Sequence, residues 1–369
     1  MELVVRKNDL LRELHLLQGI VERKNTVPVL ANVLMEANGD ELRLAATDIE
    51  VGLRSRCQAS VSKGGSLTVP AKKLYEVVKA LPDTDVRIER DRSGVKLAAD
   101  RFESRMPTLP TEEFPTLPEP PGVAAQILPP KLLHAMIGMT QFAITAEDTR
   151  FYLNGALLVL APGSLTLVGT DGHRLAHVTA KRAEGAADSS ETRIILPRKL
   201  LSELSRLLAE EEADVSFQQS ENHLFFEIGG RTLFSRVVDA QFPAYERVIP
   251  KGNDKRIDFD RDRLSNAVRR VALLSNERSR AVKFDIGEGR VEITSNSQEF
   301  GEAREQLSVD YSQPQMQICF NAQYVLDFLG AVQSDTVVLE FKDEMSQAVM
   351  KPAAMEDVDY LYVLMPMRL

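Results

Sequence analysis

The chain has 369 residues, a formal net charge of −9 and 44% hydrophobic residues. That length suggests two to three domains, and the acidic balance argues against a protein that coats nucleic acid with its whole surface. The two cysteines, Cys57 and Cys319, are too few and too far apart for a disulfide framework or a metal cluster, so we expect free thiols, a reducing compartment and no metal or cofactor.

The N-terminus carries no recognisable targeting signal. Its first residues, MELVVRKNDLL, lack the basic region followed by an apolar stretch that marks a signal peptide. No apolar run in the chain approaches the ~20 residues that a membrane span needs. The sequence therefore predicts a soluble, cytoplasmic protein that does not bind membranes.

Helical and extended patterns alternate along the chain. Leu10, Leu14 and Leu17 follow helical spacing behind Asn8, which we expect to cap the first helix. Short alternating or apolar runs between the helical patterns, such as ELRLAAT and HLFFEIG, predict strands. The expected helical stretches are residues 7–23, 71–80, 130–143, 198–209, 261–274 and 321–333.

An internal repeat is the most informative feature of the sequence. TVPAKKLYEVVKAL, ILPRKLLSELSRLL and CFNAQYVLDFLGAV start at Thr68, Ile195 and Cys319, which gives a period of about 125 residues. The motifs LAATDIEVGLRS, LVGTDGHRLAHVT and ITSNSQEFGEARE keep nearly the same period. Such a period is too long for a solenoid repeat, so each unit is expected to be a domain.

Pro-rich linkers end the first two repeats and set the expected domain boundaries. They read LPTEEFPTLPEPPG and DAQFPAYERVIPKGND, and both suit extended connectors. Each repeat holds two helical patterns beside many short strands, which predicts an α+β domain with its helices on one face of antiparallel sheets. The predicted domains are residues 1–121, 122–250 and 251–369.

The predicted helices are basic as a group, and the remainder of the chain is acidic. One explanation is that Lys and Arg are good helix formers on a solvated face. The other is that all the helices share one face and meet a polyanion through phosphate contacts. The sequence has no helix-turn-helix, zinc finger or aromatic RNA-binding stripe, so any contact with duplex DNA would be independent of base sequence.

Four motifs stand out within the triple repeat: YLNG at 152–155, TDGHRLA at 170–176, FPAYERVIP at 242–250 and the terminal MPMRL. With them, the whole chain resembles the bacterial DNA polymerase III beta subunit family, the replicative sliding clamps. The resemblance implies a head-to-tail homodimer, in which each chain supplies three clamp domains and so half of a six-domain ring around duplex DNA. Its implied partners are DNA polymerase III alpha and other DNA polymerases, the clamp loader, and repair proteins with short clamp-binding peptides.

The resemblance also offers a reason for the apolar C-terminus. In this family the C-terminus borders a hydrophobic groove between the second and third domains, and flexible methionines let one groove accept several partners. The alternative is a buried final strand with ordinary core methionines. The groove positions that the resemblance implies are Leu153, Thr170, Gly172, His173, Arg174, Leu175, Pro243, Arg247, Val248, Asn321, Tyr324, Met345, Val363, Met365, Pro366, Met367 and Arg368.

Two further residue sets are expected. The dimer seam would bring Phe102 and Met106 to Leu273 and Leu274, with Glu299, Glu302 and Glu305 facing basic residues of the partner chain. The second set is expected to face the DNA, although any single basic residue in it can also be a solvated surface charge. That set is Lys24, Lys72, Lys73, Lys79, Arg150, Tyr152, Arg198, Lys199, Arg206, Arg269, Arg270, Arg278 and Arg280.

Two other function classes compete with a clamp. An enzyme could use Asp171 to orient His173 as a general base, but no nucleophile is marked nearby and His173 and His177 lack the Glu of a helical zinc site. We therefore expect no catalytic residue, and loading of a ring would need an external ATPase. A peptide-binding scaffold that never touches DNA is the third class, and retention on closed circular DNA would distinguish it.

Overall fold

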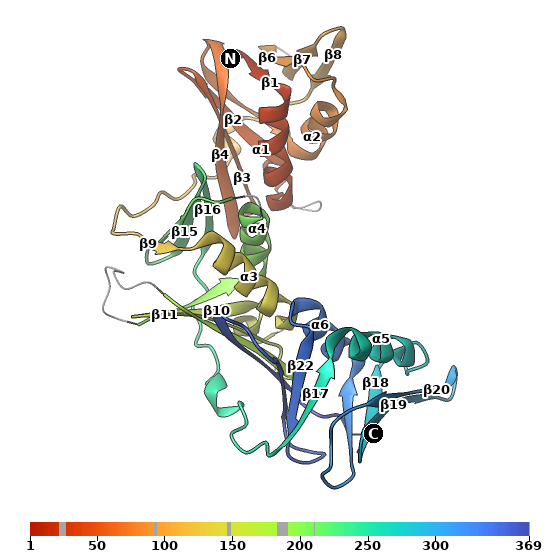
Figure 1. The fold of residues 1–369 in the computed structure, drawn as a ribbon. Coiled ribbons are helices and arrows are strands. Elements are labelled where there is room, and N and C mark those ends of the chain that lie inside the picture. The colour runs from red at the N-terminus through yellow and green to blue at the C-terminus, as the bar shows by residue number, and fades with distance from the viewer. Residues whose placement is uncertain (22–26, 92–93, 146–148, 183–190, 210, 369) are drawn as a thin grey trace. The chain divides into compact units, whose positions relative to one another are not determined.

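The structure, a computed structural model, describes residues 1–369 except 22–26, 92–93, 146–148, 183–190, 210 and 369. The chain divides into two compact units, Met1–His134 with Lys199–Val237, and Ala135–Arg198 with Val238–Leu369. Helices and antiparallel sheets make up both units (Figure 1), so the α+β prediction is confirmed. No helix in the described part of the chain is long and apolar enough to cross a membrane.

A twelve-stranded antiparallel sheet is the framework of the first unit. Its strands are β1 (Glu2–Arg6), β2 (Asn32–Asn38), β3 (Glu41–Thr47), β4 (Val51–Lys63), β5 (Gly65–Pro70), β6 (Asp85–Asp91), β7 (Gly94–Ala99), β8 (Phe102–Met106), β9 (Gln126–Leu128), β14 (Val215–Gln219), β15 (His223–Ile228) and β16 (Arg231–Arg236). The main path runs β8-β7-β6-β1-β4-β16-β15-β14-β9, and β3, β2 and β5 branch from β4 in that order. The β4–β16 pair joins the first repeat to the second.

Two helices of the first repeat pack together in this unit. They are α1 (Lys7–Ile20) and α2 (Ala71–Ala80), and α1 also lies against β3 and β4. Leu10, Leu14 and Leu17 face the sheet and are fully buried, as their spacing predicts. Two further helices, α3 (Pro130–Thr140) and α4 (Arg198–Leu208), carry residues of both units.

The expected Asn8 cap is wrong. Helix α1 begins at Lys7, its N-cap residue is Arg6, and no side chain caps it. Strand β1 runs directly into the helix: Arg6 still pairs with Asp85, and the backbone N–H of Lys7 donates to the Thr84 carbonyl at 3.2 Å. The loop that leads into β6 therefore satisfies the first helical donor, and Asn8 instead donates to Asp83 Oδ1 at 2.9 Å.

The second unit holds an eight-stranded sheet and a four-stranded sheet, both antiparallel. The strands are β10 (Gly155–Ala161), β11 (Ser164–Thr170), β12 (Arg174–Lys181), β13 (Thr192–Pro197), β17 (Lys255–Asp260), β18 (Ala281–Gly287), β19 (Arg290–Ser297), β20 (Gly301–Ser308), β21 (Met316–Asn321), β22 (Thr336–Phe341), β23 (Ala348–Pro352) and β24 (Val358–Leu364). The larger sheet runs β13-β10-β11-β12-β24-β23-β22-β17, and the smaller runs β20-β19-β18-β21. The β12–β24 pair joins the second repeat to the third, as β4–β16 joins the first to the second.

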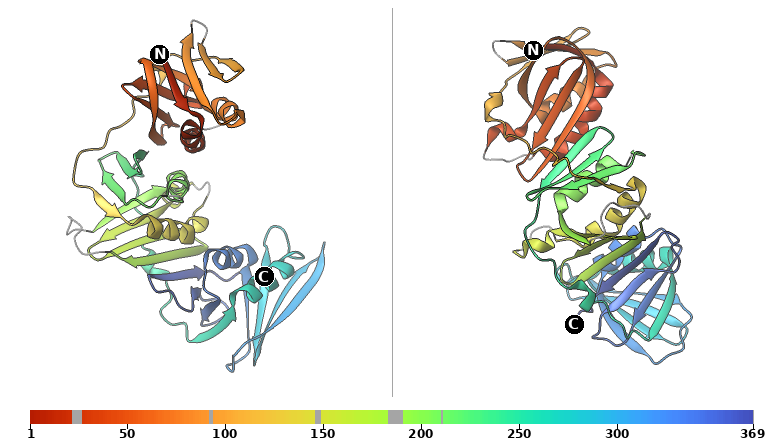
Figure 2. Two further views of the ribbon diagram at one scale, coloured as in Figure 1. Left: turned by 45° about the horizontal axis from the view of Figure 1, so that its top comes forward. Right: turned by 90° about the vertical axis from the view of Figure 1, so that its left-hand side faces the viewer.

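The third repeat keeps the same pairing of helices. Helices α5 (Arg261–Ala272) and α6 (Ala322–Ala331) pack against each other beside β17–β21, as Figure 1 and the left view of Figure 2 show. Side chains cap both helices: Asp260 accepts from the Arg263 N–H at 2.8 Å, and Asn321 accepts from the Gln323 N–H at 2.9 Å. A stretch expected to start at residue 321 therefore becomes a helix only at Ala322.

One buried ion pair ties α1 to the β16 strand of the second repeat. Glu13 is 1% exposed, and Arg231 donates to both of its carboxylate oxygens, at 2.8 and 2.7 Å. A carboxylate so far from water is tolerated only when its lone pairs are filled. The pair therefore fixes how the first two repeats meet within this unit.

Replacing Arg231 with Met should lower the free energy of unfolding by about 3–5 kcal/mol, because the buried carboxylate then keeps a single contact, at 3.2 Å, with the exposed Arg12. The matched control is Arg256→Met, which breaks an equally bidentate pair with Asp258 whose side chains are 54% and 49% exposed; little change is expected there. Urea unfolding of the two variants measures both values. Equal losses would show that burial of Glu13 does not matter.

Candidate functional site

The C-terminal tail is held beside the start of β12. Strand β24 ends at Leu364, between β12 and β23. Beyond it, the Met365 N–H donates to the His173 carbonyl at 3.0 Å, and the Met367 N–H donates to the Cys319 carbonyl at 2.8 Å. Residues 365–368 are therefore neither a sheet strand nor a free end.

A tight turn, Thr170–Arg174, leads into β12 and lies next to the C-terminal tail. Thr170 Oγ1 donates to the Arg174 carbonyl at 2.7 Å and accepts the Gly172 N–H at 3.1 Å. Asp171 Oδ1 accepts the N–H groups of His173 and Arg174. Gly172 has φ +88° and sits 3.3 Å from the Arg150 guanidinium, measured from an added Cβ, so a larger residue there would be strained and crowded.

Buried side chains form a floor under the turn and the tail. Leu175 and Val363, 3% and 2% exposed, belong to one cluster with Phe242 and Tyr245 from the linker that follows the second repeat. Leu153 and Thr170 are also buried. The linker thus packs on the same part of the sheet as the end of β24.

Apolar side chains remain exposed above this floor. Val248, Met345 and Met365 are 42%, 51% and 39% exposed. Ala348 of β23 pairs with Leu364, so Met345 and Met365 extend from the same end of two neighbouring strands. The backbone of Val248 is bonded to Tyr245, which reaches the floor. Three segments thus bring flexible apolar side chains to one region.

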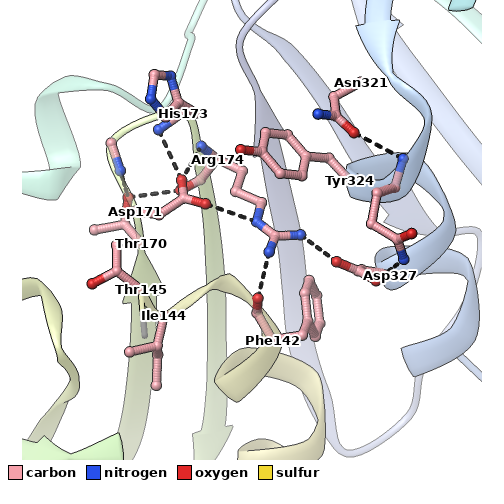
Figure 3. Close-up of polar contacts among 12 residues, drawn as sticks. Phe142, Ile144, Thr145, Thr170, Asp171, His173, Arg174, Asn321, Tyr324 and Asp327 are labelled. Atoms are coloured by element: carbon pink, nitrogen blue, oxygen red, sulfur yellow. Dashed lines mark hydrogen bonds and ion pairs between the residues drawn. The ribbon is translucent and has the colours of Figure 1, made fainter. Parts of the chain in front are cut away.

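Arg174 is the hub of the polar contacts in this region (Figure 3). Its Nε donates to Asp171 Oδ2 at 3.0 Å, Nη1 to Asp327 Oδ2 at 2.5 Å, and Nη2 to the Phe142 carbonyl at 2.5 Å. Burial opposes its charge, but contacts with Tyr362 and with the two carboxylates raise the pKa of Arg174. The guanidinium is therefore permanently charged and internally paired.

The expected groove positions fall into three classes of exposure. Leu153, Thr170, Leu175 and Val363 are buried; Arg174, Asn321, Tyr324, Pro366 and Met367 are half-buried; Gly172, His173, Pro243, Arg247, Val248, Met345, Met365 and Arg368 are exposed. All of them belong to the second unit. Two polar members are already engaged within the chain, because every guanidinium nitrogen of Arg174 donates and Asn321 Oδ1 caps α6.

Sequence reasoning missed Asp327 and Phe142, which hold Arg174 in place. Asp327 carried a usable signal, because it is the only charged residue in the stretch 321–333. A single charge on an otherwise uncharged helix often has a partner. The carbonyl of Phe142 carried no signal, since a backbone acceptor is independent of residue type.

The expected DNA-facing residues differ in exposure and in their contacts within the chain. Lys72, Lys73, Lys79, Arg150, Arg198, Arg269, Arg270, Arg278 and Arg280 are exposed; Tyr152, Lys199 and Arg206 are half-buried; Lys24 lies outside the described residues. Lys199 Nζ donates to Asp48 and to the Ile20 carbonyl, and Arg206 donates to Glu203 and to the His15 carbonyl. Internal contacts therefore occupy Lys199 and Arg206.

The expected seam residues are mostly open to solvent in the single chain. Phe102 and Leu273 are 42% and 76% exposed, whereas Met106 is already 9% exposed and offers little area. Leu274 is half-buried, and Glu299 and Glu302 are exposed. Glu305 receives a bidentate contact from Arg270 of its own chain, with N–O distances of 2.8 and 2.5 Å.

The carboxylate of Asp171 does not support the acid–base alternative. Its described bonds go to the backbone N–H groups of His173 and Arg174 and to Arg174 Nε. In Figure 3 the His173 imidazole points away from this cluster. A general base needs its ring oriented by a partner, and here Asp171 orients the turn instead.

His177, two strand residues beyond the floor residue Leu175, is a half-buried histidine with an unusual environment. Its ring lies 5.6 Å from that of Tyr245, and within the described structure its buried Nδ1 has no hydrogen-bond partner. Burial lowers the pKa of His177, and the carboxylates of Asp359 and Glu246 only partly oppose this. Burial next to Tyr245 of the linker therefore favours the neutral imidazole.

Comparison with known proteins identifies close relatives. Models of the DNA polymerase III beta subunit match in chain order: the N-terminal domain at residues 1–118, the central domain at 127–244 and the C-terminal domain at 246–368. The beta sliding clamps of Pseudomonas putida and Escherichia coli are 39% and 34% identical, over 100% of both chains in each case.

Solved structures agree with these matches. A sliding clamp from Pseudomonas aeruginosa, bound to griselimycin, has a TM-score of 0.93 at 38% identity. The beta sliding clamp of Caulobacter crescentus, with polyethylene glycol bound to the region suggested for beta-motif tethering, has a TM-score of 0.92 at 36% identity. Both comparisons cover 100% of each chain.

Replacing His177 with Phe should reduce the loss of stability in mild acid. The folded-state pKa lies below the ordinary histidine value of 6.5, so the unfolded chain binds the proton more readily, and stability falls as the pH drops from that value toward the folded pKa. The slope from one such group is at most about 1.4 kcal/mol per pH unit. Urea unfolding between about pH 5 and 8 measures it, and parallel curves for variant and parent would contradict this role.

Proposed function

The chain belongs to the DNA polymerase III beta subunit family of sliding clamps, and we propose that it is a processivity clamp that closes around duplex DNA as a head-to-tail homodimer. The observation that carries the proposal is the match of all three domain models, in order, along the whole chain. The clamp acts by tethering a polymerase, and it has no catalytic residues of its own.

Three similar domains per chain, residues 1–121, 122–250 and 251–369, would supply a six-domain ring from two copies. The repeated strand junctions, β4–β16 and β12–β24, support this division because each joins one repeat to the next in the same way. Ring closure would then use the two ends of the chain. At these ends β8 and β20 are outermost strands of their sheets.

The proposed seam joins Phe102 and Met106 of one copy to Leu273 and Leu274 of the other, with Glu299, Glu302 and Glu305 facing basic residues. Large exposed apolar side chains at both ends support it: Phe102 lies on the outermost strand β8, and Leu273 caps the C-terminus of α5. An exposed edge strand favours association with another chain. Contact with DNA would rest on exposed basic residues of the helices, such as Lys72, Lys79 and Arg269.

The second unit would bind short peptides of polymerases, the clamp loader and repair proteins. We name the region of Val248, Met345 and Met365, with its buried floor, the tail site. Exposed methionines over a packed apolar floor support peptide binding, because methionine adapts to differently shaped partners. The Caulobacter crescentus relative binds polyethylene glycol in the region suggested for beta-motif tethering, which fits an extended, flexible ligand.

Topological retention on DNA tests the ring. Protein loaded onto nicked circular DNA by a clamp loader should survive high salt and leave when the circle is linearised, whereas direct phosphate contact weakens with salt. Gel filtration of the DNA complex measures both. Leu273→Ala with Leu274→Ala should give monomer that is never retained, since apolar truncations cost roughly 2–5 kcal/mol each when buried. Retention after linearisation would contradict the ring.

Truncation of the tail tests the peptide site. Removing residues 365–369 should weaken binding of a short Gln-, Leu- and Phe-containing peptide by at least tenfold, about 1.4 kcal/mol, while the dimer persists. Met365→Ala should act in the same direction because its side chain is 39% exposed at the tail site. Fluorescence anisotropy of labelled peptide, beside a sizing column, measures the effect.

Ile127→Ala is the matched control, because Ile127 is 50% exposed and lies on β9 of the first unit. It removes a similar amount of exposed apolar surface outside the tail site and should leave peptide affinity unchanged. Unaltered affinity in the truncated dimer would assign residues 365–369 to the fold alone.

A further inference from the structure

We propose that Asp327 is a positioning residue of the tail site, which fixes Arg174 as a rigid platform beneath the ring of Tyr324. The inference rests on the proposed function and deepens it, because it assigns a wall of the peptide site to a carboxylate that does not touch the peptide. It also reassigns Arg174 from a donor to the ligand to a support for the aromatic ring.

The contacts of Arg174 leave its guanidinium little freedom. Its side chain is 10% exposed, and those of Asp171 and Asp327 are 13% and 22% exposed. The two carboxylates and the Phe142 carbonyl receive its Nε, Nη1 and Nη2. Each nitrogen of this planar guanidinium already donates a hydrogen bond. The group therefore cannot turn toward a ligand without losing charge-assisted bonds.

The guanidinium lies between two aromatic rings. Arg174 Cζ is 4.2 Å from the ring centroid of Tyr324 and 5.5 Å from that of Phe142. At such distances a cation and a ring face attract each other. The orientation of the Tyr324 ring, a half-buried member of the expected groove, is therefore coupled to the position of Arg174.

One helix supplies both the ring and the carboxylate. Tyr324 and Asp327 are three residues apart on α6, so they lie on the same face. Asp327 uses one oxygen for Arg174 and the other for Gln323 Nε2, at 2.7 Å. Gln323 in turn donates its N–H to the helix cap Asn321. The carboxylate is thus oriented from its own helix before it meets Arg174, as Figure 3 shows.

The charge balance of the cluster points the same way. Arg174 brings one positive charge against the two carboxylates of Asp171 and Asp327, so the cluster offers no net positive charge to a peptide. A guanidinium that recognised an acidic peptide group would need an unfilled donor edge. The tail site should therefore select its ligand by packing on Tyr324 and the exposed methionines.

Loss of Asp327 should be visible in the free protein and in peptide binding. The chain has 7 tyrosines, so 3-fluorotyrosine labelling gives a small set of ¹⁹F resonances, and Tyr324→Phe assigns the relevant one. In Asp327→Ala this resonance should shift and broaden, and affinity for the labelled Gln-, Leu- and Phe-containing peptide should fall about tenfold. Asp327→Asn keeps an acceptor oxygen for Arg174 and should restore most of both readouts.

Asp262→Ala is the matched control, since Asp262 also pairs with an arginine from a helix but is 74% exposed; neither readout should move. An unshifted Tyr324 resonance in Asp327→Ala overturns the positioning role, whether or not peptide binds. A shifted resonance with unchanged peptide affinity also overturns it. If the unaltered protein fails to bind the peptide, the proposed peptide site itself is wrong, which is a separate outcome.

Discussion

The tail site depends on the pairing of β12 with β24. The register runs from Arg174 opposite Leu364 to Ala180 opposite Val358, so the end of one repeat lies beside the start of a strand in another. A slip of one residue would turn every side chain of β24 to the opposite face. It would remove Val363 from the buried floor and part the Met365 N–H from the His173 carbonyl. Backbone pairing thus places the turn, the tail and the linker together.

The same turn serves both junctions between repeats, with different chemistry. Asp48 accepts the N–H groups of residues 50 and 51, as Asp171 accepts those of residues 173 and 174. In the first unit Asp48 also binds Lys199, which comes from α4 of the next repeat. In the second unit Asp171 binds Arg174 of its own turn, and Arg174 reaches α6 through Asp327. At the first junction the compact ammonium group of Lys199 contacts one carboxylate. At the second, the planar guanidinium of Arg174 donates to several acceptors at once.

Much of this architecture could be predicted from the sequence, because the spacing of apolar residues within a short stretch indicates which of its faces is buried. The spacing of Leu10, Leu14 and Leu17 was enough to predict their helix. The repeated motifs predicted that the domains share one arrangement of helices and strands. Contacts between distant residues could not be predicted this way. Arg174 and Asp327 are 153 residues apart. The arginine could therefore be assigned to the site from its motif, but the acceptors that engage each nitrogen of its guanidinium could not. The Asn8 cap failed for a similar reason, since the acceptor is the carbonyl of the distant Thr84, just before β6.

The anchoring of the tail has a thermodynamic consequence for whatever binds there. The N–H groups of Met365 and Met367 are both bonded, and Pro366 between them has no N–H to satisfy. Proline also restricts the unfolded chain, so less entropy is lost when this segment orders. A ligand that packs on Met365 therefore meets a backbone that is ordered in advance. Association then restricts mainly side-chain rotamers, at about 0.5–1.5 kcal/mol for each immobilised side chain, and the methionines can adapt their shape while the main chain beneath them stays fixed.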